Sequence, residues 1–173
     1  AADFESHGTH VAGIIGADGP TLQGAAPKVN FMALKVCSGI SCTSGAIIRG
    51  LVESFYNSSG LTADVVNISL GSQQGYTADI YSYLIRDLAA KFGAVFFVSA
   101  SNSGAGFRSI NSLGHFGPIV SVGASVSRET LLQHYDVNIL SGAPEHSVFG
   151  FSSAGPNYTG QLRPNIVAPG SAL

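Results

Sequence analysis

Ala94-Val-Phe-Phe-Val-Ser-Ala100 is the stretch that decides the fold of this 173-residue chain. A nearly continuous apolar run of this length is typical of a strand that is buried on both faces, as the strands of parallel sheets are. Segments of the same character lie at 29–36, 64–70 and 118–124. We predict that these segments are buried strands of a mainly parallel sheet.

The segments between these strands carry apolar residues at helical spacing. One predicted helix includes Ile47 to Phe55 and follows Thr43 and Ser44, either of which can cap its first turn. Another includes Ile80 to Leu88, and Gly93 is a suitable C-terminal stop. Strands and helices in alternation predict an α/β fold.

The composition excludes several classes of partner. Hydrophobic residues make up 45% of the chain, charged residues make up 10%, and the net charge is −2. The charges are scattered without a basic run, which predicts no binding to nucleic acid or to an anionic membrane surface. The longest apolar run, 94–98, is far shorter than the roughly 18 residues that indicate a membrane-spanning helix. The sequence gives no indication of an oligomeric state.

Cysteines and glycosylation sequons bear on the compartment. Cys37 and Cys42 flank a glycine-containing loop, which allows either a small disulfide or two reduced thiols. Sequons occur at Asn57, Asn67 and Asn157, although Asn67 lies inside a strand-like run where a glycan does not fit. Together these features favour an extracellular or secreted protein.

Near its start the chain carries a histidine motif. A helix is predicted from Ser6 to Ile15, with Gly8, Ala12 and Gly13 small enough for close backbone packing. It contains His7-Gly-Thr-His-Val-Ala-Gly13, which resembles the histidine motif of the subtilases, a family of serine proteases. In that motif the first histidine is the general base, a role that implies proton transfer by His7.

Further segments resemble subtilase landmarks and follow in the family's order. They lie at 24–36, 66–71, 98–104, 117–124, 151–156 and 163–170. The resemblance covers 1–173 except for 125–149, where periodicity fades and which we predict to be a surface insertion. It implies a three-layer α/β/α catalytic domain truncated at both ends, without the upstream strand that carries the triad aspartate and the downstream helix that carries the serine.

The resemblance also assigns roles around a substrate cleft. Asn102 matches the oxyanion-hole asparagine, although the glycine that usually precedes it is replaced here by Ser101. Ser69, Leu70 and Gly71 match one wall of the cleft, and Ala100 with Ser101 forms part of a pocket floor. A polypeptide would bind there in extended form, by adding as a strand.

Other polar residues near the histidine have competing interpretations. Asp3 either lines the cleft or is a solvated loop acid, and it does not match the family's aspartate motif. We expect His10 to be a buried packing or hydrogen-bonding residue. The loop 18–23 follows the helix, where many subtilases bind calcium, but its only charged ligand is Asp18. Because calcium takes six to eight oxygens, we predict no metal site and no cofactor in this chain.

The function that the resemblance implies is serine endopeptidase activity through a Ser-His-Asp triad, of which this chain holds the histidine and the oxyanion-hole asparagine. The isolated chain is then expected to be inactive. One alternative is a non-catalytic peptide-binding module or pseudoenzyme that keeps the cleft. Another is an α/β nucleotide-binding domain, but no glycine-rich phosphate loop follows a strand.

Overall fold

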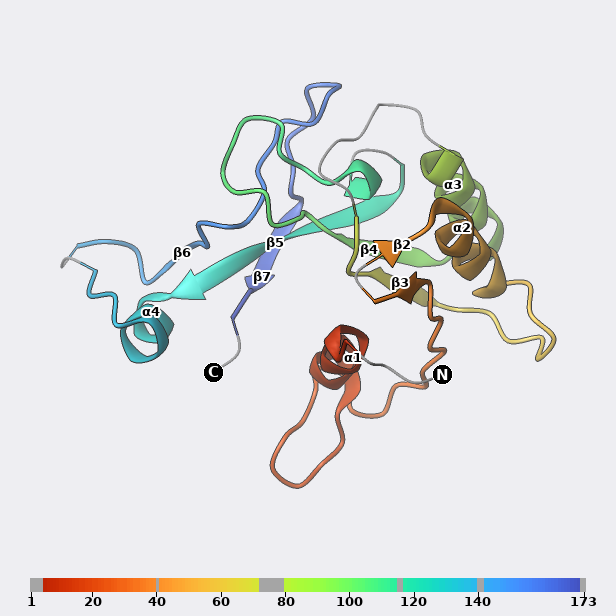
Figure 1. Cartoon of the computed structure of the whole chain (residues 1–173), viewed down its shortest axis with the longest axis horizontal. Coiled ribbons are helices and arrows are strands. Elements are labelled where there is room, and N and C mark those ends of the chain that lie inside the picture. The colour runs from red at the N-terminus through yellow and green to blue at the C-terminus, as the bar shows by residue number, and fades with distance from the viewer. Residues whose placement is uncertain (1–4, 40, 72–79, 115–116, 140–141, 172–173) are drawn as a thin grey trace. The chain divides into compact units, whose positions relative to one another are not determined.

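The computed structural model describes residues 5–39, 41–71, 80–114, 117–139 and 142–171 (Figure 1). The chain divides into two compact units, Ala1–Ala63 and Asp64–Leu173, and each is described by itself. Among the described residues, no helix is long and apolar enough to cross a membrane.

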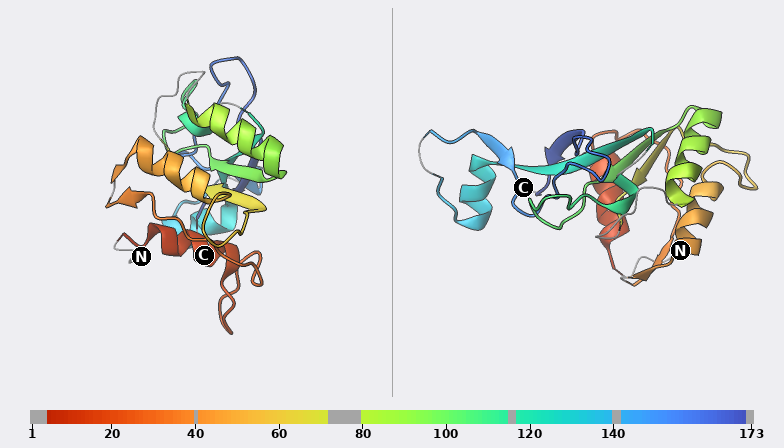
Figure 2. Two further views of the ribbon diagram at one scale, coloured as in Figure 1. Left: turned by 90° about the vertical axis from the view of Figure 1, so that its right-hand side faces the viewer. Right: turned by 90° about the horizontal axis from the view of Figure 1, so that it is seen from above.

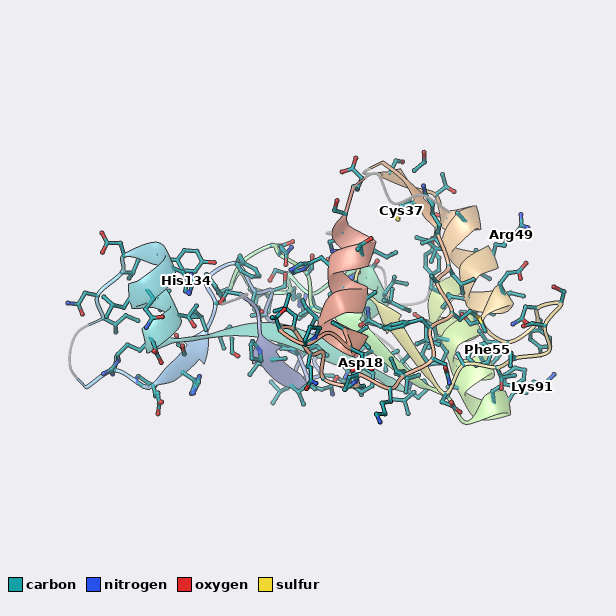
Figure 3. The ribbon with its side chains drawn as sticks, turned by 90° about the horizontal axis from the view of Figure 1, so that it is seen from below. Asp18, Cys37, Arg49, Phe55, Lys91 and His134 are labelled. Atoms are coloured by element: carbon teal, nitrogen blue, oxygen red, sulfur yellow. A yellow bond between two sulfur atoms is a disulfide. The ribbon has the colours of Figure 1, made fainter. Side chains whose placement is uncertain are left out.

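Among its described residues, the first unit contains two helices and a short hairpin. Helix α1 spans His7–Gly16, strands β1 (Cys37–Ser38) and β2 (Ser41–Cys42) pair antiparallel, and α2 spans Ser44–Glu53. A disulfide joins Cys37 to Cys42, so the structure has the disulfide of the two alternatives (Figure 3). Thr43 caps α2, because its side-chain oxygen accepts from the backbone N–H of Ala46 at 3.3 Å.

The predicted strand at 29–36 is wrong. No strand is assigned there, and the side chains of Val29, Phe31 and Leu34 are 43%, 52% and 39% exposed. A strand requires a neighbour that pairs with its backbone N–H and C=O groups. No described segment pairs with 29–36, so its apolar pattern does not produce a strand.

Close packing around α1 also differs from the prediction. A Cβ added to Gly13 would meet no atom within 4 Å, whereas one added to Gly16 would lie 2.7 Å from side-chain carbons of both Val29 and Phe31. Close packing at the end of α1 therefore depends on Gly16, and also on Gly24, where an added Cβ would lie 2.5 Å from the backbone nitrogen of Gly16. Beyond Gly16, a bridge between Asp18 and Gln23 closes the loop 18–23 into a tight turn.

The second unit is built on a five-stranded sheet. Its strands are β3 (Val65–Ile68), β4 (Val95–Ser99), β5 (Ile119–Ser127), β6 (His146–Val148) and β7 (Ile166–Pro169). β4 lies parallel between β3 and β5, β7 pairs parallel with β5, and β6 pairs antiparallel with β5. The α/β class and the mainly parallel sheet are confirmed, and the predicted strands at 64–70, 94–100 and 118–124 correspond to β3, β4 and β5.

In the part of the second unit that the structure describes, two α-helices accompany this sheet. α3 (Ile80–Phe92) follows β3 and buries Ile85 and Leu88, whereas Ile80, the first apolar residue of the predicted helix, is 59% exposed. α4 (Arg128–Tyr135) continues directly from β5, at the end of that strand away from α3 (Figure 2). The described residues of 125–149 therefore contain regular structure, namely the end of β5, α4 and β6. Weak periodicity concealed these elements because α4 is short and buries only Thr130.

The core of the second unit lies around β4. Phe96, Val98 and Ala100 are at most 1% exposed. Their side chains alternate with half-buried or exposed neighbours along the strand, so one face of β4 carries most of the packing. This core holds the carboxyl end of β4 in place, where the predicted oxyanion segment begins.

Candidate active site

His7 is the first residue of α1, and its side chain is exposed. Ser6 takes the N-cap position with φ of 60° and without a side-chain cap hydrogen bond, and its backbone C=O accepts from His10 N–H at 2.9 Å. His10 is also exposed, so the prediction that it is a buried packing residue is wrong. The histidine motif thus presents both imidazoles on the accessible surface of α1. Asp3 lies outside the described residues.

The segment with Asn102 leaves the sheet directly after β4. Ala100 is buried, and its N–H donates to Val122 C=O at 2.7 Å, which continues the pairing with β5. Ser101 then turns the chain with φ of 97°, in a region that favours glycine. After this turn, Asn102 is exposed and therefore accessible to a ligand.

The Ser69–Gly71 wall and the Asn102 segment emerge at the same edge of the sheet. β3 and β4 are parallel and in register, with Ile68 opposite Val98. Carboxyl ends of adjacent parallel strands meet at one edge, so Ser69 and Ala100 leave the sheet next to each other. The structure therefore brings together the five predicted cleft residues and Asn102 within the second unit.

Asn111 ties these two segments together. Its side chain is fully buried, and its amide nitrogen donates to Leu70 C=O at 2.8 Å and to Ser99 C=O at 3.3 Å. Its side-chain oxygen accepts from the N–H of Leu113 at 3.0 Å. A Cβ on Gly71 would lie 1.8 Å from that same amide nitrogen, so a glycine is required there.

Sequence reasoning did not identify Asn111. A lone asparagine in a loop is usually a turn residue. The available signal was its position between Ile110 and Leu113, which are both buried hydrophobic residues and place the asparagine in the core. A polar side chain in such surroundings must find hydrogen-bond partners, and here they are the ends of two strands.

Comparison with known proteins defines the family. The family model of the subtilases (Peptidase_S8) matches residues 1–172. The chain belongs to the subtilase family. It is 30% identical to serine protease AprX of Bacillus subtilis, with 97% of the chain and 38% of AprX covered. It is 35% identical to subtilisin DY of Bacillus licheniformis, with 91% and 62% covered.

A solved structure supports the same assignment. Sphericase superposes with a TM-score of 0.75 at 26% sequence identity, over 99% of this chain and 54% of that structure. The three-dimensional fold and the sequence therefore lead to the same family. The chain spans 12% of the length of pyrolysin, 38% of AprX and 62% of subtilisin DY, so it corresponds to part of such a protein.

In this subtilase chain the two halves of the predicted site lie in different units. His7 belongs to the first, whereas Asn102 and the cleft residues belong to the second. Each half has the accessibility that its predicted role demands, because His7 and Asn102 are both exposed. Their roles stay predictions.

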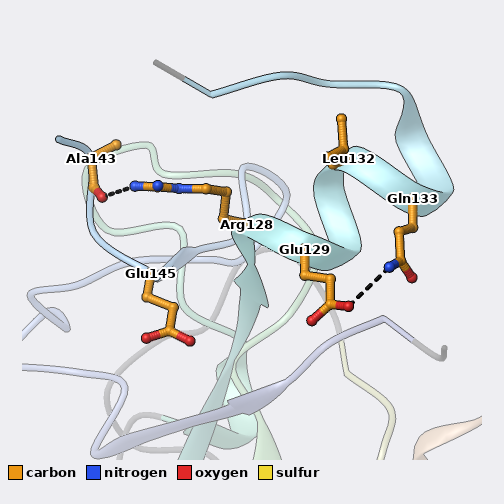
Figure 4. A pocket seen from close by; sticks show the side chains of 6 residues that line it. All are labelled: Arg128, Glu129, Leu132, Gln133, Ala143 and Glu145. Carbon is orange, nitrogen blue, oxygen red and sulfur yellow. Dashed lines mark hydrogen bonds between the residues drawn. The ribbon is translucent and has the colours of Figure 1, made fainter. Parts of the chain in front are cut away.

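Metal ligands and cavities are separate from these residues. Within the described part of the chain, no group of three or more His, Cys, Asp or Glu side chains is placed to hold a metal ion. The 18–23 loop offers one carboxylate, a donor set that does not fit calcium. A cavity of about 620 Å³ lies beside α4 and contains no predicted site residue (Figure 4). It is lined by Arg128, Glu129, Leu132, Gln133, Ala143 and Glu145.

Proposed function

We propose that this chain is part of the catalytic domain of a subtilisin-like serine endopeptidase, which hydrolyses peptide bonds through a Ser-His-Asp triad. The observation that carries the proposal is the edge where β3 and β4 end. There Asn102 is exposed beside the wall that ends at Gly71, and Asn111 joins the two segments.

In this proposal Asn102 stabilises the developing oxyanion. When a nucleophile attacks a peptide carbonyl, the carbonyl oxygen gains negative charge, and a side-chain N–H donor held in place lowers the energy of that state. An asparagine at the end of a buried strand suits this role, because the core around Phe96 and Val98 fixes the backbone from which it projects. Its exposure leaves the amide free to meet the substrate.

His7 is proposed to be the general base. It would accept the proton of the serine hydroxyl during attack and return it to the leaving amine. A carboxylate that orients the imidazole and stabilises the imidazolium formed in this step completes such a triad. The triad aspartate and the nucleophilic serine are not identified in this sequence, so the isolated 1–173 chain is expected to be inactive.

The substrate is proposed to be a polypeptide in extended form. Backbone groups of Ser69, Leu70 and Gly71 would pair with it, and Gly71 would allow its main chain to approach closely. An extracellular location is part of the proposal and rests on the Cys37–Cys42 disulfide. The sequons add little to it. Asn157 is fully buried, and its amide donates to the Gln161 side chain at 2.9 Å.

Substitutions in the complete protein test the two roles. Asn102→Ala should lower kcat by roughly a hundredfold or more with little change in KM, as loss of the corresponding donor does in a subtilisin. His7→Ala should lower kcat by several orders of magnitude. Asn138→Ala and His134→Ala are matched controls on exposed residues and should leave both constants unchanged.

The alternative of a non-catalytic peptide-binding module makes a different prediction. A complete protein that bound peptides tightly but released no cleavage product, with or without His7, would contradict the protease proposal. An unchanged kcat in Asn102→Ala would refute the oxyanion role alone.

A further inference from the structure

The turn that presents Asn102 is held from outside by a second segment of the chain. Ser153 N–H donates to Ser101 C=O at 3.0 Å, and the side-chain oxygen of Ser153 accepts from Ser103 N–H at 3.0 Å. Gly104 N–H donates to Phe151 C=O at 2.8 Å. The segment 151–153 therefore pairs with the backbone immediately before and after Asn102.

Ser153 is the only residue of that segment that contacts both sides of Asn102 by these bonds, one through its backbone and one through its side chain. It is 1% exposed. A buried side chain with a fixed partner has little freedom to move, and the N–H of Ser103 would be left unpaired if the hydroxyl were removed.

The segment 151–153, which we call the clamp, is itself anchored through the next residue, Ala154. Ala154 N–H donates to the Ser109 hydroxyl at 2.9 Å, Ser109 N–H donates to Ala154 C=O at 3.1 Å, and the Ser109 hydroxyl donates to Gly104 C=O at 2.6 Å. The turn and the clamp thus share a third point of attachment, which fixes the position of Ser153 against the turn.

The turn needs such support because of Ser101. A non-glycine residue with φ of 97° is in an unfavourable backbone conformation, which persists only when surrounding contacts enforce it. The bond from Ser153 N–H is made to the carbonyl of Ser101 itself. Without the clamp, the backbone on either side of Asn102 can relax. The side-chain amide of Asn102 then points in a different direction.

We propose that Ser153 is a positioning residue for Asn102, which fixes the direction of the amide that stabilises the oxyanion. This inference rests on the proposed function. A misplacement of about 1 Å in a catalytic group can cost on the order of a hundredfold in rate, so partial loss of this support should appear in kcat.

The neighbouring serine provides a matched control. Ser152 is also fully buried, and its hydroxyl accepts from a backbone N–H, that of Ala124 in β5, at 3.0 Å. Ser152→Ala and Ser153→Ala thus remove the same chemical group at equal burial. The two variants differ in the backbone N–H that loses its acceptor. Ser152→Ala affects Ala124 in the sheet, and Ser153→Ala affects Ser103, next to Asn102.

The experiment measures kcat and KM of the complete protein for both variants, alone and combined with Asn102→Ala, on a peptide that the wild-type protein cleaves. Ser153→Ala should lower kcat about tenfold with KM nearly constant, and Ser152→Ala should not. In the Asn102→Ala background, Ser153→Ala should change kcat by less than about twofold, because the group that it positions is gone.

If Ser153→Ala does not fold, Ser153→Cys retains a weaker acceptor in a slightly larger side chain and should lower kcat in the same way to a smaller extent. Equal kcat values for the Ser152 and Ser153 variants would overturn the inference, as would an undiminished effect of Ser153→Ala without Asn102. If instead Asn102→Ala left kcat unchanged, the oxyanion role in the proposed function would fail first.

Discussion

Ser101 precedes the predicted oxyanion asparagine with a backbone that glycine adopts more easily. A φ of 97° destabilises the folded state when serine adopts it, because its Cβ is crowded there, whereas glycine adopts this φ without that strain. Ser101→Gly should therefore raise the free energy of unfolding by about 1 kcal/mol, even though glycine is more flexible in the unfolded chain. Urea unfolding of the variant measures this.

A control for Ser101→Gly lies four residues along. Ala105 is exposed and does not have a positive φ, so Ala105→Gly should lower the free energy of unfolding by about 0.5 to 1 kcal/mol. If both glycine variants were destabilised, the strain assigned to Ser101 would be refuted.

Gly71 must be a glycine because a neighbouring side chain occupies the space of a Cβ, and not because of its backbone angle. Gly71→Ala places a Cβ within 2.1 Å of three atoms of the Asn111 side chain, so the variant should lose roughly 1 to 3 kcal/mol of stability. Asn111→Ala removes the obstructing atoms, so Gly71→Ala should cost less stability in the Asn111→Ala background than in the wild-type protein. Thermal unfolding of the single and double variants measures this difference. Gly45→Ala, whose Cβ meets nothing within 4 Å, is the control and should not destabilise. Additive losses in the double variant would contradict the contact.

Helix α1 provides a test at the scale of an element, because its glycines are not equivalent. Gly13→Ala adds a Cβ in open space and should stabilise the helix by about 1 kcal/mol. Gly16→Ala pushes a Cβ against Val29 and Phe31 and should be destabilising. Thermal unfolding of the two variants, followed by circular dichroism, should shift the midpoint in opposite directions. A shift in the same direction would show that α1 does not pack on the 29–31 segment as described.

The elements also show how far local pattern predicts structure. β4, β3 and β5 were found from their apolar runs because each has a paired neighbour in the sheet. The equally apolar 29–36 was mispredicted, since no described segment pairs with it. α4 and β6 were missed because an element that buries few residues leaves little periodicity in the sequence.

The molecule as a whole exposes many large hydrophobic residues. They include Ile166 and Val167 of β7, each 48% exposed, together with Ile14, Ile80 and Val65. Apolar surface of this kind binds hydrophobic dyes and favours association. We predict that the purified 1–173 chain enhances the fluorescence of ANS strongly, whereas a longer form with a complete subtilase domain does so much less. Weak fluorescence from the short chain, together with strong protection of its amides from hydrogen exchange, would contradict this.

The sequence by itself determined the α/β class, the order of the main strands and the subtilase family, because these follow from short motifs and from apolar runs along the chain. For the site, the sequence predicted His7, Asn102 and the cleft residues by their residue types and their places in the motifs. The tertiary structure alone decided which strands find partners, that Ser101 adopts a positive φ, and that Asn111 and Ser153 bond to the backbone of the predicted site segments. The Asn111–Leu70 and Ser103–Ser153 hydrogen bonds join residues 41 and 50 positions apart, and such contacts leave no periodicity in the local sequence.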